Sequence, residues 1–283
     1  MTLQVARSIE EVQSFLAPKR LEGKRVGFAP TMGALHEGHL SLMRRAKADC
    51  DVVVVSIYVN PTQFGPGEDR ERYPRTFERD RELCESVGVD LLFHPTNDMM
   101  YPEGYATYVT VARLSEPLCG QSRPTHFRGV TTIVLKLFNI VSPDVAYCGW
   151  KDAQQAVLIK RMVEDLNLPV EIVALPTVRE ADGLAMSSRN QYLDAASRRQ
   201  APAIYAALEK ARAAFEQNGV DNCAALKKII RDYIESQTAG RIDYVEIVSL
   251  DRLESLERVQ RANTLVAVAV HLGGARLIDN VRL

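Results

Sequence analysis

Short apolar segments alternate with amphipathic segments along the first part of the chain. The apolar segments are rich in β-branched residues, as strands buried on both faces of a parallel sheet are, and they cover residues 25–29, 51–59, 90–93, 144–148 and 170–175. Between them, apolar residues recur at helical spacing from Leu40 onward and over 76–87, 131–141 and 153–166. This rhythm predicts an α/β fold with a doubly wound, Rossmann-like parallel sheet.

The pattern changes after about Thr177. Residues 197–217 and 222–236 have helical spacing and are joined by a turn at Asn218-Gly219. Strand-like segments follow at 244–249, 264–271 and 276–281, with a hairpin turn at Gly273-Gly274. Helices followed by a short antiparallel meander predict a second, smaller α+β domain over residues 178–283, after a first domain over residues 1–177.

The composition is that of an average globular protein. Of the 283 residues, 46% are hydrophobic and 25% charged, and the formal net charge of −1 provides no overall field for nucleic acid or an anionic membrane. The five cysteines are widely spaced and form no CxxC pair, which favours structural thiols in a reducing compartment. Because no apolar run approaches the roughly 18 residues of a membrane span, we expect a cytoplasmic protein that binds neither nucleic acid nor membrane.

The loop after the first of these strands carries the most informative residues. It reads Pro30-Thr-Met-Gly-Ala-Leu-His-Glu-Gly-His39, and the next helix begins at its end. Such a loop lines the ligand crevice of a doubly wound sheet, where the helix N-terminus attracts phosphate. His36 and His39 are three residues apart and can face one direction, so both can donate hydrogen bonds to a polyphosphate.

Other interpretations of this loop remain open. The histidines could be surface or capping residues, and a zinc site is a weaker reading because no third His or Cys stands at a supporting spacing. Neither a GxxxxGK[ST] loop nor a GxGxxG fingerprint occurs in the sequence. A nucleotide would therefore be held by the His-x-Gly-His turn instead.

That turn resembles the signature of the nucleotidyltransferase group that includes class I aminoacyl-tRNA synthetases, and Ala185-Met-Ser-Ser-Arg189 resembles the group's second signature. Within the group, the chain resembles the pantoate–β-alanine ligase family. The resemblance runs from about Val26 to Tyr192 and includes Val59-Asn-Pro-Thr-Gln-Phe64, Arg123-Pro-Thr-His-Phe-Arg-Gly129 and Gly149-Trp-Lys-Asp-Ala-Gln-Gln155.

The resemblance implies that ATP and pantoate form pantoyl adenylate and pyrophosphate, and that the amine of β-alanine then attacks to give pantothenate and AMP. ATP chemistry implies Mg²⁺ with the nucleotide. The resemblance implies a homodimer and, together with the position of Met186 to Arg189, a C-terminal lid domain, or the loop leading to it, that closes over ATP, and Asp182-Gly183 is the expected joint. The resemblance places the catalytic histidine at His39, and we expect His36, Lys151 and Arg189 to act with it. Nucleotide contacts are implied at Met32, Gly33, Ala34, Leu35, His36, Glu37, Gly38, His39, Gly149, Trp150, Lys151, Asp152, Val178, Met186, Ser187, Ser188 and Arg189. Substrate contacts are implied at Gln63 and Gln155, whose neutral amides can bond carboxylate and hydroxyl oxygens.

Several roles stay open on the sequence. Asp152 can cap the following helix, contact the nucleotide, or both. Asn60 and the charged residues of 123–129, Arg123, His126 and Arg128, can bind ligand or brace their loop. Trp150 stands where the family usually has Glu, which puts the nucleotide contact of that turn in doubt. The alternative functions are another nucleotidyl-transferring enzyme of this fold and a catalytically silent nucleotide-binding protein.

Overall fold

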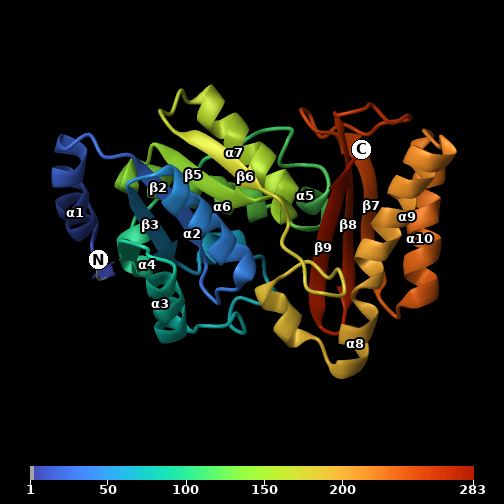
Figure 1. Ribbon diagram of the computed structural model, residues 1–283, viewed down its shortest axis with the longest axis horizontal. Coiled ribbons are helices and arrows are strands. Elements are labelled where there is room, and N and C mark those ends of the chain that lie inside the picture. The colour runs from blue at the N-terminus through green and yellow to red at the C-terminus, as the bar shows by residue number, and fades with distance from the viewer. Residues whose placement is uncertain (1–2) are drawn as a thin grey trace.

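In the computed structural model, which describes residues 3–283, the first half of the chain forms a six-stranded parallel sheet (Figure 1). Its order is β1-β4-β3-β2-β5-β6, so the order reverses between β2 and β5. The strands are β1 (Gln4–Ala6), β2 (Val26–Thr31), β3 (Val52–Ile57), β4 (Leu91–Phe93), β5 (Val145–Gly149) and β6 (Glu171–Leu175). The predicted doubly wound sheet is confirmed, and its carboxyl edge at the β2/β5 reversal is the place where ligands bind in such sheets.

Helices cover both faces of this sheet. Helices α1 (Ile9–Leu21), α6 (His126–Val141) and α7 (Ala153–Asp165) share one apolar cluster with Phe28 and Val54. Helices α2 (Glu37–Asp49) and α3 (Phe77–Ser86) cover the opposite face, where Val53 and Val55 are buried. All six residues of β3 are buried, Ser56 included, as expected for a central strand of a parallel sheet.

The structure corrects the sequence prediction in this half at two places. Strand β1 and helix α1 were not predicted, although Ser8 and Glu11 form a capping box at the start of α1. Helix α6 begins at His126, five positions before the predicted start at 131, so His126 and Arg128 lie on its first turn rather than in a loop. Short helical turns also occur at α4 (Asn97–Met100), α5 (Cys119–Ser122), η1 (Pro61–Gln63), η2 (Trp150–Asp152) and η3 (Ser188–Tyr192).

The C-terminal part of the described chain forms the predicted antiparallel meander, β7 (Arg241–Ser249), β8 (Thr264–Leu272) and β9 (Ala275–Arg282). Gly273 and Gly274 both have positive φ, which the tight β8–β9 hairpin requires. Along β8, Val266, Val268 and Val270 pack on the helices, whereas Leu265 and Ala267 belong to the cluster of the large sheet. In Figure 1 this small sheet accordingly stands between the large sheet and the helix pair α9 and α10.

The helix predicted at 197–217 is two helices, α8 (Ala195–Gln200) and α9 (Ala203–Asn218). Pro202 lies between them. It interrupts the helix because it lacks an amide hydrogen and its ring would clash with the preceding turn of a continuous helix. The predicted helix at 222–236 is α10 (Cys223–Gln237), with Asn222 as its N-cap. None of the helices formed by residues 3–283 combines the length and apolar character needed to span a bilayer.

Candidate active site at the sheet reversal

A cavity of about 890 Å³ opens at the carboxyl edge of the large sheet, between β2, β5 and the small sheet. Its walls include fourteen of the residues that the sequence singled out: Met32, His36, Gly38, His39, Gln63, Gly149, Lys151, Asp152, Gln155, Val178, Met186, Ser187, Ser188 and Arg189. Of the described residues, the five other predicted contacts, Gly33, Ala34, Leu35, Glu37 and Trp150, do not line it. Segments far apart in the sequence therefore converge on one space.

The two histidines of the loop occupy the start of α2. His36 is the N-cap residue, and its Nδ1 accepts the amide hydrogen of Gly38 at 3.2 Å. His39 Nδ1 accepts the amide hydrogen of His36 at 3.3 Å, and the two rings lie 4.1 Å apart. Because both Nδ1 atoms accept, each neutral ring carries its proton on Nε2. The capping interpretation and the ligand-binding interpretation thus hold together, since Nδ1 caps the helix and Nε2 remains a donor.

Burial keeps these rings neutral. Desolvation, followed by the nearby Lys151 charge, lowers the pKa of His36 to about 4. Desolvation, the neighbouring His36 and Lys151 lower the pKa of His39 to about 3. Both imidazoles are therefore uncharged at neutral pH and act as hydrogen-bond donors without adding a cation to the cavity.

A buried carboxylate shapes the loop before them. Asp80 of α3 is 1% exposed and accepts the amide hydrogens of Ala34 and Leu35, both at 2.8 Å. Gly33 and Ala34 have φ of 81° and 49°, and the two bonds to Asp80 stabilise this left-handed turn. The amide hydrogens of Ala34 and Leu35 are thus already used, which weakens their prediction as nucleotide contacts. Sequence reasoning missed Asp80, since nothing distinguishes it from the other acidic residues of α3.

The turn after β5 presents Lys151 to the cavity. Its Nζ lies 3.6 Å from Asp152 Oδ2, and its side chain is 20% exposed. Burial opposes ionisation of Asp152, but Lys151 and Arg189 hold the pKa of its carboxyl below its usual range. Asp152 is the N-cap residue of α7, but within the described chain its carboxylate makes no hydrogen bond to the first turn of that helix. The carboxylate pairs with the neighbouring ammonium instead.

Trp150, at the position where the family usually has Glu, faces away from the cavity. The Arg282 guanidinium of β9 lies 3.5 Å from the centre of the indole ring. The Trp150 carbonyl accepts a hydrogen bond from Asn280 at 2.9 Å. The Trp150 side chain therefore contacts the small sheet, and the backbone of its turn presents Lys151 to the cavity.

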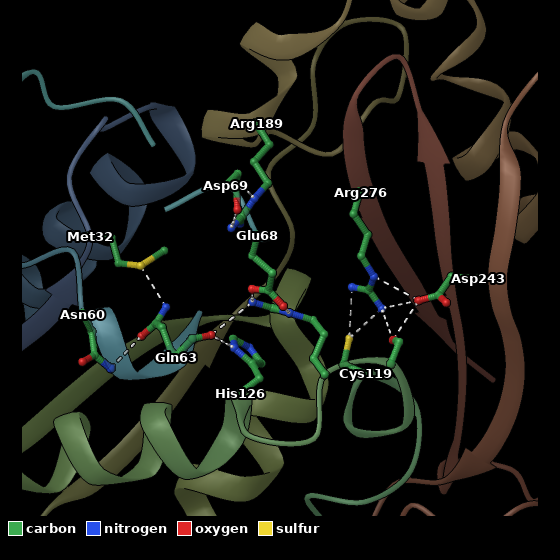
Figure 2. A network of polar contacts seen from close by, with 12 residues as sticks. Met32, Asn60, Gln63, Glu68, Asp69, Cys119, His126, Arg189, Asp243 and Arg276 are labelled. Carbon is green, nitrogen blue, oxygen red and sulfur yellow. Dashed lines mark hydrogen bonds and ion pairs between the residues drawn. The ribbon is translucent and has the colours of Figure 1, made fainter. Parts of the chain in front are cut away.

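The second signature reaches the cavity from the opposite side. Ser188 Oγ donates to the Ala34 carbonyl at 3.2 Å, which ties η3 to the histidine loop. Arg189 donates to both carboxylate oxygens of Asp69, at 2.8 and 3.0 Å (Figure 2). Burial raises the pKa of the Asp69 carboxyl, but the hydrogen bonds and charge of Arg189 outweigh this and hold the pKa below its usual range. Arg189 is thus held beside the cavity by a bidentate ion pair.

Gln63 also lines the cavity and is held by a set of polar contacts (Figure 2). Its side-chain oxygen accepts from Asn60 at 3.2 Å, and its Nε2 donates to Met32 Sδ at 2.8 Å. Its backbone carbonyl accepts from Arg123 at 3.2 Å and lies 2.9 Å from His126 Nδ1. The structure therefore gives Asn60, Arg123 and His126 a bracing role around Gln63.

Other residues singled out by the sequence differ in whether they contact the cavity or hold the surrounding backbone and loops. Arg123 also pairs with Glu68, with its Nε 2.8 Å from the carboxylate. Arg128 instead lies over the Tyr108 ring, 5.0 Å from its centre. Gln154 and Gln155 of α7 both line the cavity, but Gln154, which the sequence did not single out, is buried and bonds the backbone at Leu114, Pro117 and Cys119.

The matching family model and several highly similar proteins all concern the same enzyme family. The family model "Pantoate-beta-alanine ligase" matches residues 4–282. A pantothenate synthetase of Pelotomaculum thermopropionicum is 55% identical over 279 residues, covering 99% of this chain and 98% of that protein. The crystal structure of pantothenate synthetase from Thermus thermophilus superposes with a TM-score of 0.93 at 45% identity, with 99% of each chain covered.

A second solved structure carries ligands. It is a pantoate-beta-alanine ligase from Francisella tularensis, complexed with beta-gamma ATP and beta-alanine, which is 35% identical with a TM-score of 0.82 and covers 99% of this chain and 98% of its own. The family model and these relatives extend over nearly the whole chain, including the C-terminal third that follows the sequence motifs. The chain therefore belongs to the pantoate–β-alanine ligase family.

Proposed function

We propose that this chain carries out the ATP-dependent ligation of pantoate and β-alanine at the cavity described above, through a pantoyl adenylate. The observation that carries the proposal is the convergence on one cavity of two neutral histidines, Lys151 and Arg189 with the amides of Gln63 and Gln155. The histidines and the two cations suit a polyphosphate, and the amides suit a small hydroxy acid.

In the first step a carboxylate oxygen of pantoate attacks the α-phosphorus of ATP, and the bond to the bridging oxygen of pyrophosphate breaks. Negative charge is shared among the phosphate oxygens in the transition state. The Nε2–H groups of His36 and His39 and the ammonium of Lys151 are fixed donors that stabilise this charge. Arg189 exchanges its Asp69 partner for phosphate when ATP occupies the cavity.

In the second step the amine of β-alanine attacks the acyl carbon of the adenylate. The carbon–oxygen bond to AMP breaks, AMP leaves with the electron pair, and the amine loses a proton as the amide forms. The Gln63 and Gln155 amides hold the pantoyl group throughout. A neutral amide suits this task because it bonds hydroxyl and carbonyl oxygens without the desolvation cost of a buried charge.

Mg²⁺ fits the site as a companion of ATP rather than as a resident ion. Among residues 3–283, no group of three or more His, Cys, Asp or Glu side chains is arranged to hold a metal. Mg²⁺ commonly keeps several waters and binds through substrate phosphates and one or two carboxylates. Asp152 is the carboxylate of the cavity wall that we assign to it, because its only ion pair among the described residues is the 3.6 Å contact with Lys151, whereas Glu68, Asp69, Asp243 and Asp279 are engaged by arginines.

The test is pantoate-dependent exchange of radiolabelled pyrophosphate into ATP. We expect exchange in the presence of pantoate, and no exchange without it, because the adenylate forms reversibly before β-alanine is needed. Another nucleotidyl-transferring enzyme would exchange with a different co-substrate. A silent nucleotide-binding protein would bind ATP and exchange nothing, and either result would contradict the proposal.

Gln155 is expected to serve pantoate rather than ATP. Replacing it with Ala should raise the KM for pantoate by about tenfold or more, in line with losing one or two buried hydrogen bonds, and should leave the KM for ATP within about twofold. The measurement is initial-rate kinetics with each substrate varied in turn. Gln154→Ala is the control for loss of scaffold bonding, and an equal rise in both KM values in Gln155→Ala would refute the assignment.

We further propose that residues 178–283 form a unit that closes over the bound substrates. Closure would exclude water from an adenylate that water hydrolyses. Amide hydrogen exchange over 179–192, compared between the free enzyme and the enzyme with ATP and pantoate, tests this. Added protection is expected, whereas identical protection in both states would show a segment already in its final position, as its contacts with Ala34 and Asp69 allow. The homodimer and the cytoplasmic location stay predictions.

A further inference from the structure

Two adjacent polar residues, Asp279 and Asn280, lie near the end of β9 and are almost completely buried, at 4% and 5% exposure. Neighbouring residues of a strand point to opposite faces of the sheet. Asn280 pairs with Ala267, which belongs to the face toward the large sheet, and Asp279 pairs with Val268, which belongs to the face toward α9. The two side chains therefore reach different parts of the molecule.

Asn280 binds the turn that carries Lys151. Its Nδ2 donates to the carbonyl oxygens of Trp150 and Lys151, at 2.9 and 3.0 Å. Both partners are acceptors, so only the amide nitrogen can make these bonds. They join residues 129 and 130 positions apart, and they fix the backbone from which the Lys151 side chain enters the cavity.

Asp279 binds the segment that leads to the second signature. Its carboxylate accepts hydrogen bonds from both terminal guanidinium nitrogens of Arg179, at 2.6 and 2.9 Å. Arg179 also donates to the Gly183 carbonyl at 3.1 Å and forms a β-bridge with Ala185. The Arg179 side chain thus closes the turn over 179–185, directly before Met186, Ser187, Ser188 and Arg189.

We propose that Asp279 and Asn280 are positioning residues for adenylate formation. Asn280 sets the position of Lys151, and Asp279 sets the position of Ser187 to Arg189 through Arg179. One strand of the small sheet thereby fixes both cationic groups against the phosphates of a single ATP. This inference rests on the proposed function, because it assigns Lys151 and Arg189 to ATP.

The sharpest variant is Asn280→Asp. It keeps the shape of the side chain but replaces the donating nitrogen with an oxygen that repels the two carbonyls. Pantoate-dependent pyrophosphate exchange should fall by about tenfold to a hundredfold, the loss expected when a reacting group is displaced by about 1 Å. The reaction of supplied pantoyl adenylate with β-alanine should change less than about threefold, because that half-reaction does not use the pyrophosphate end of the cavity.

Trp150 provides a direct readout of the turn, since it is the one tryptophan in the sequence. Its ring is stacked against Arg282, and its backbone carbonyl is bonded to Asn280. In Asn280→Asp, the emission of Trp150 should shift to longer wavelength and become more accessible to acrylamide. Asn280→Ala, which removes the donor without adding charge, should shift the emission in the same direction and is the second variant if the first does not fold.

Asp279→Asn tests the role of Asp279 separately from that of Asn280. It removes the charge that holds Arg179 but leaves the Asn280 bonds to the turn in place. Exchange should again fall by about tenfold or more, as expected for a displaced phosphate-binding segment, while the emission of Trp150 stays that of the wild type. The two variants thus share the kinetic defect and differ in the spectrum.

Val281→Ala is the matched control for lost stability. Val281 is buried on the helix side of the same strand, and its truncation weakens the sheet without contacting either segment. It should lower the melting temperature and leave the rates per folded molecule and the emission unchanged. The inference is wrong if folded Asn280→Asp, or its Ala counterpart, exchanges at the wild-type rate, or if both half-reactions fall equally. Absence of exchange in the wild-type enzyme would instead contradict the proposed function.

Discussion

His39→Ala lowers the rate of adenylate formation by about a hundredfold or more in our expectation, which is the usual loss when one preorganised donor to a developing oxyanion is removed. The residue is neutral and its Nδ1 is occupied by the His36 amide, so its contribution is the Nε2–H donor alone. The measurement is single-turnover formation of pantoyl adenylate from saturating ATP and pantoate.

Two controls define the result for His39. His39→Gln can place an amide donor near the position of Nε2 and should recover part of the rate, whereas His39→Asn should not. His94→Ala removes a histidine that stacks on Phe77 and bonds the Ile57 carbonyl, so it should affect stability but not adenylation per folded molecule. Near-normal adenylation in folded His39→Ala would remove His39 from the mechanism.

Lys151→Met should reduce adenylation by a similar factor, about a hundredfold, because it deletes the positive charge that we propose stabilises the phosphates and keeps most of the aliphatic stem. The fold should be unaffected, since the turn is held through its backbone carbonyls by Asn280 rather than through the Lys side chain. Single-turnover rates and the melting temperature measure the two effects separately.

Lys160→Met is the matched control for Lys151, because Lys160 is an exposed residue on the helix that follows the same turn. It loses the same charge from the same part of the chain and should adenylate at the wild-type rate. A comparable loss in both variants would mean that overall charge, and not the position of Lys151, controls the reaction.

The sequence predicted those parts of the fold that depend on local pattern. The mostly apolar, β-branched segment of β3 and the Gly-Gly hairpin between β8 and β9 were both placed correctly, because each needs only its own residues. The break at Pro202 was missed, although the residue that causes it is visible. Helix α1 was missed because its apolar face is weak and Pro18 lies inside it, while Ser8 and Glu11 gave an unused signal.

In the candidate site, too, residues within local motifs were predicted and residues held by long-range contacts were not. The histidine loop, Lys151 and Arg189 were found through motifs, and the structure brings them to one cavity. Asp80 and Asn280 were not found, because their bonds join residues 45 or more positions apart and neither lies in a recognisable pattern. The choice of Gln155 rather than Gln154 as a substrate contact likewise followed from resemblance and not from spacing, and both residues line the cavity.

The ion pairs of Arg123 with Glu68 and Arg189 with Asp69 have a consequence for selectivity. Each carboxylate is attached to the same chain as its arginine, so it acts as a built-in competitor at an effective concentration on the order of millimolar or higher. A small anion such as chloride must displace that competitor with few contacts. If His39, Lys151 and Arg189 bind ATP as proposed, ATP offsets the same cost over several contacts at once, so the free enzyme would discriminate against such small anions.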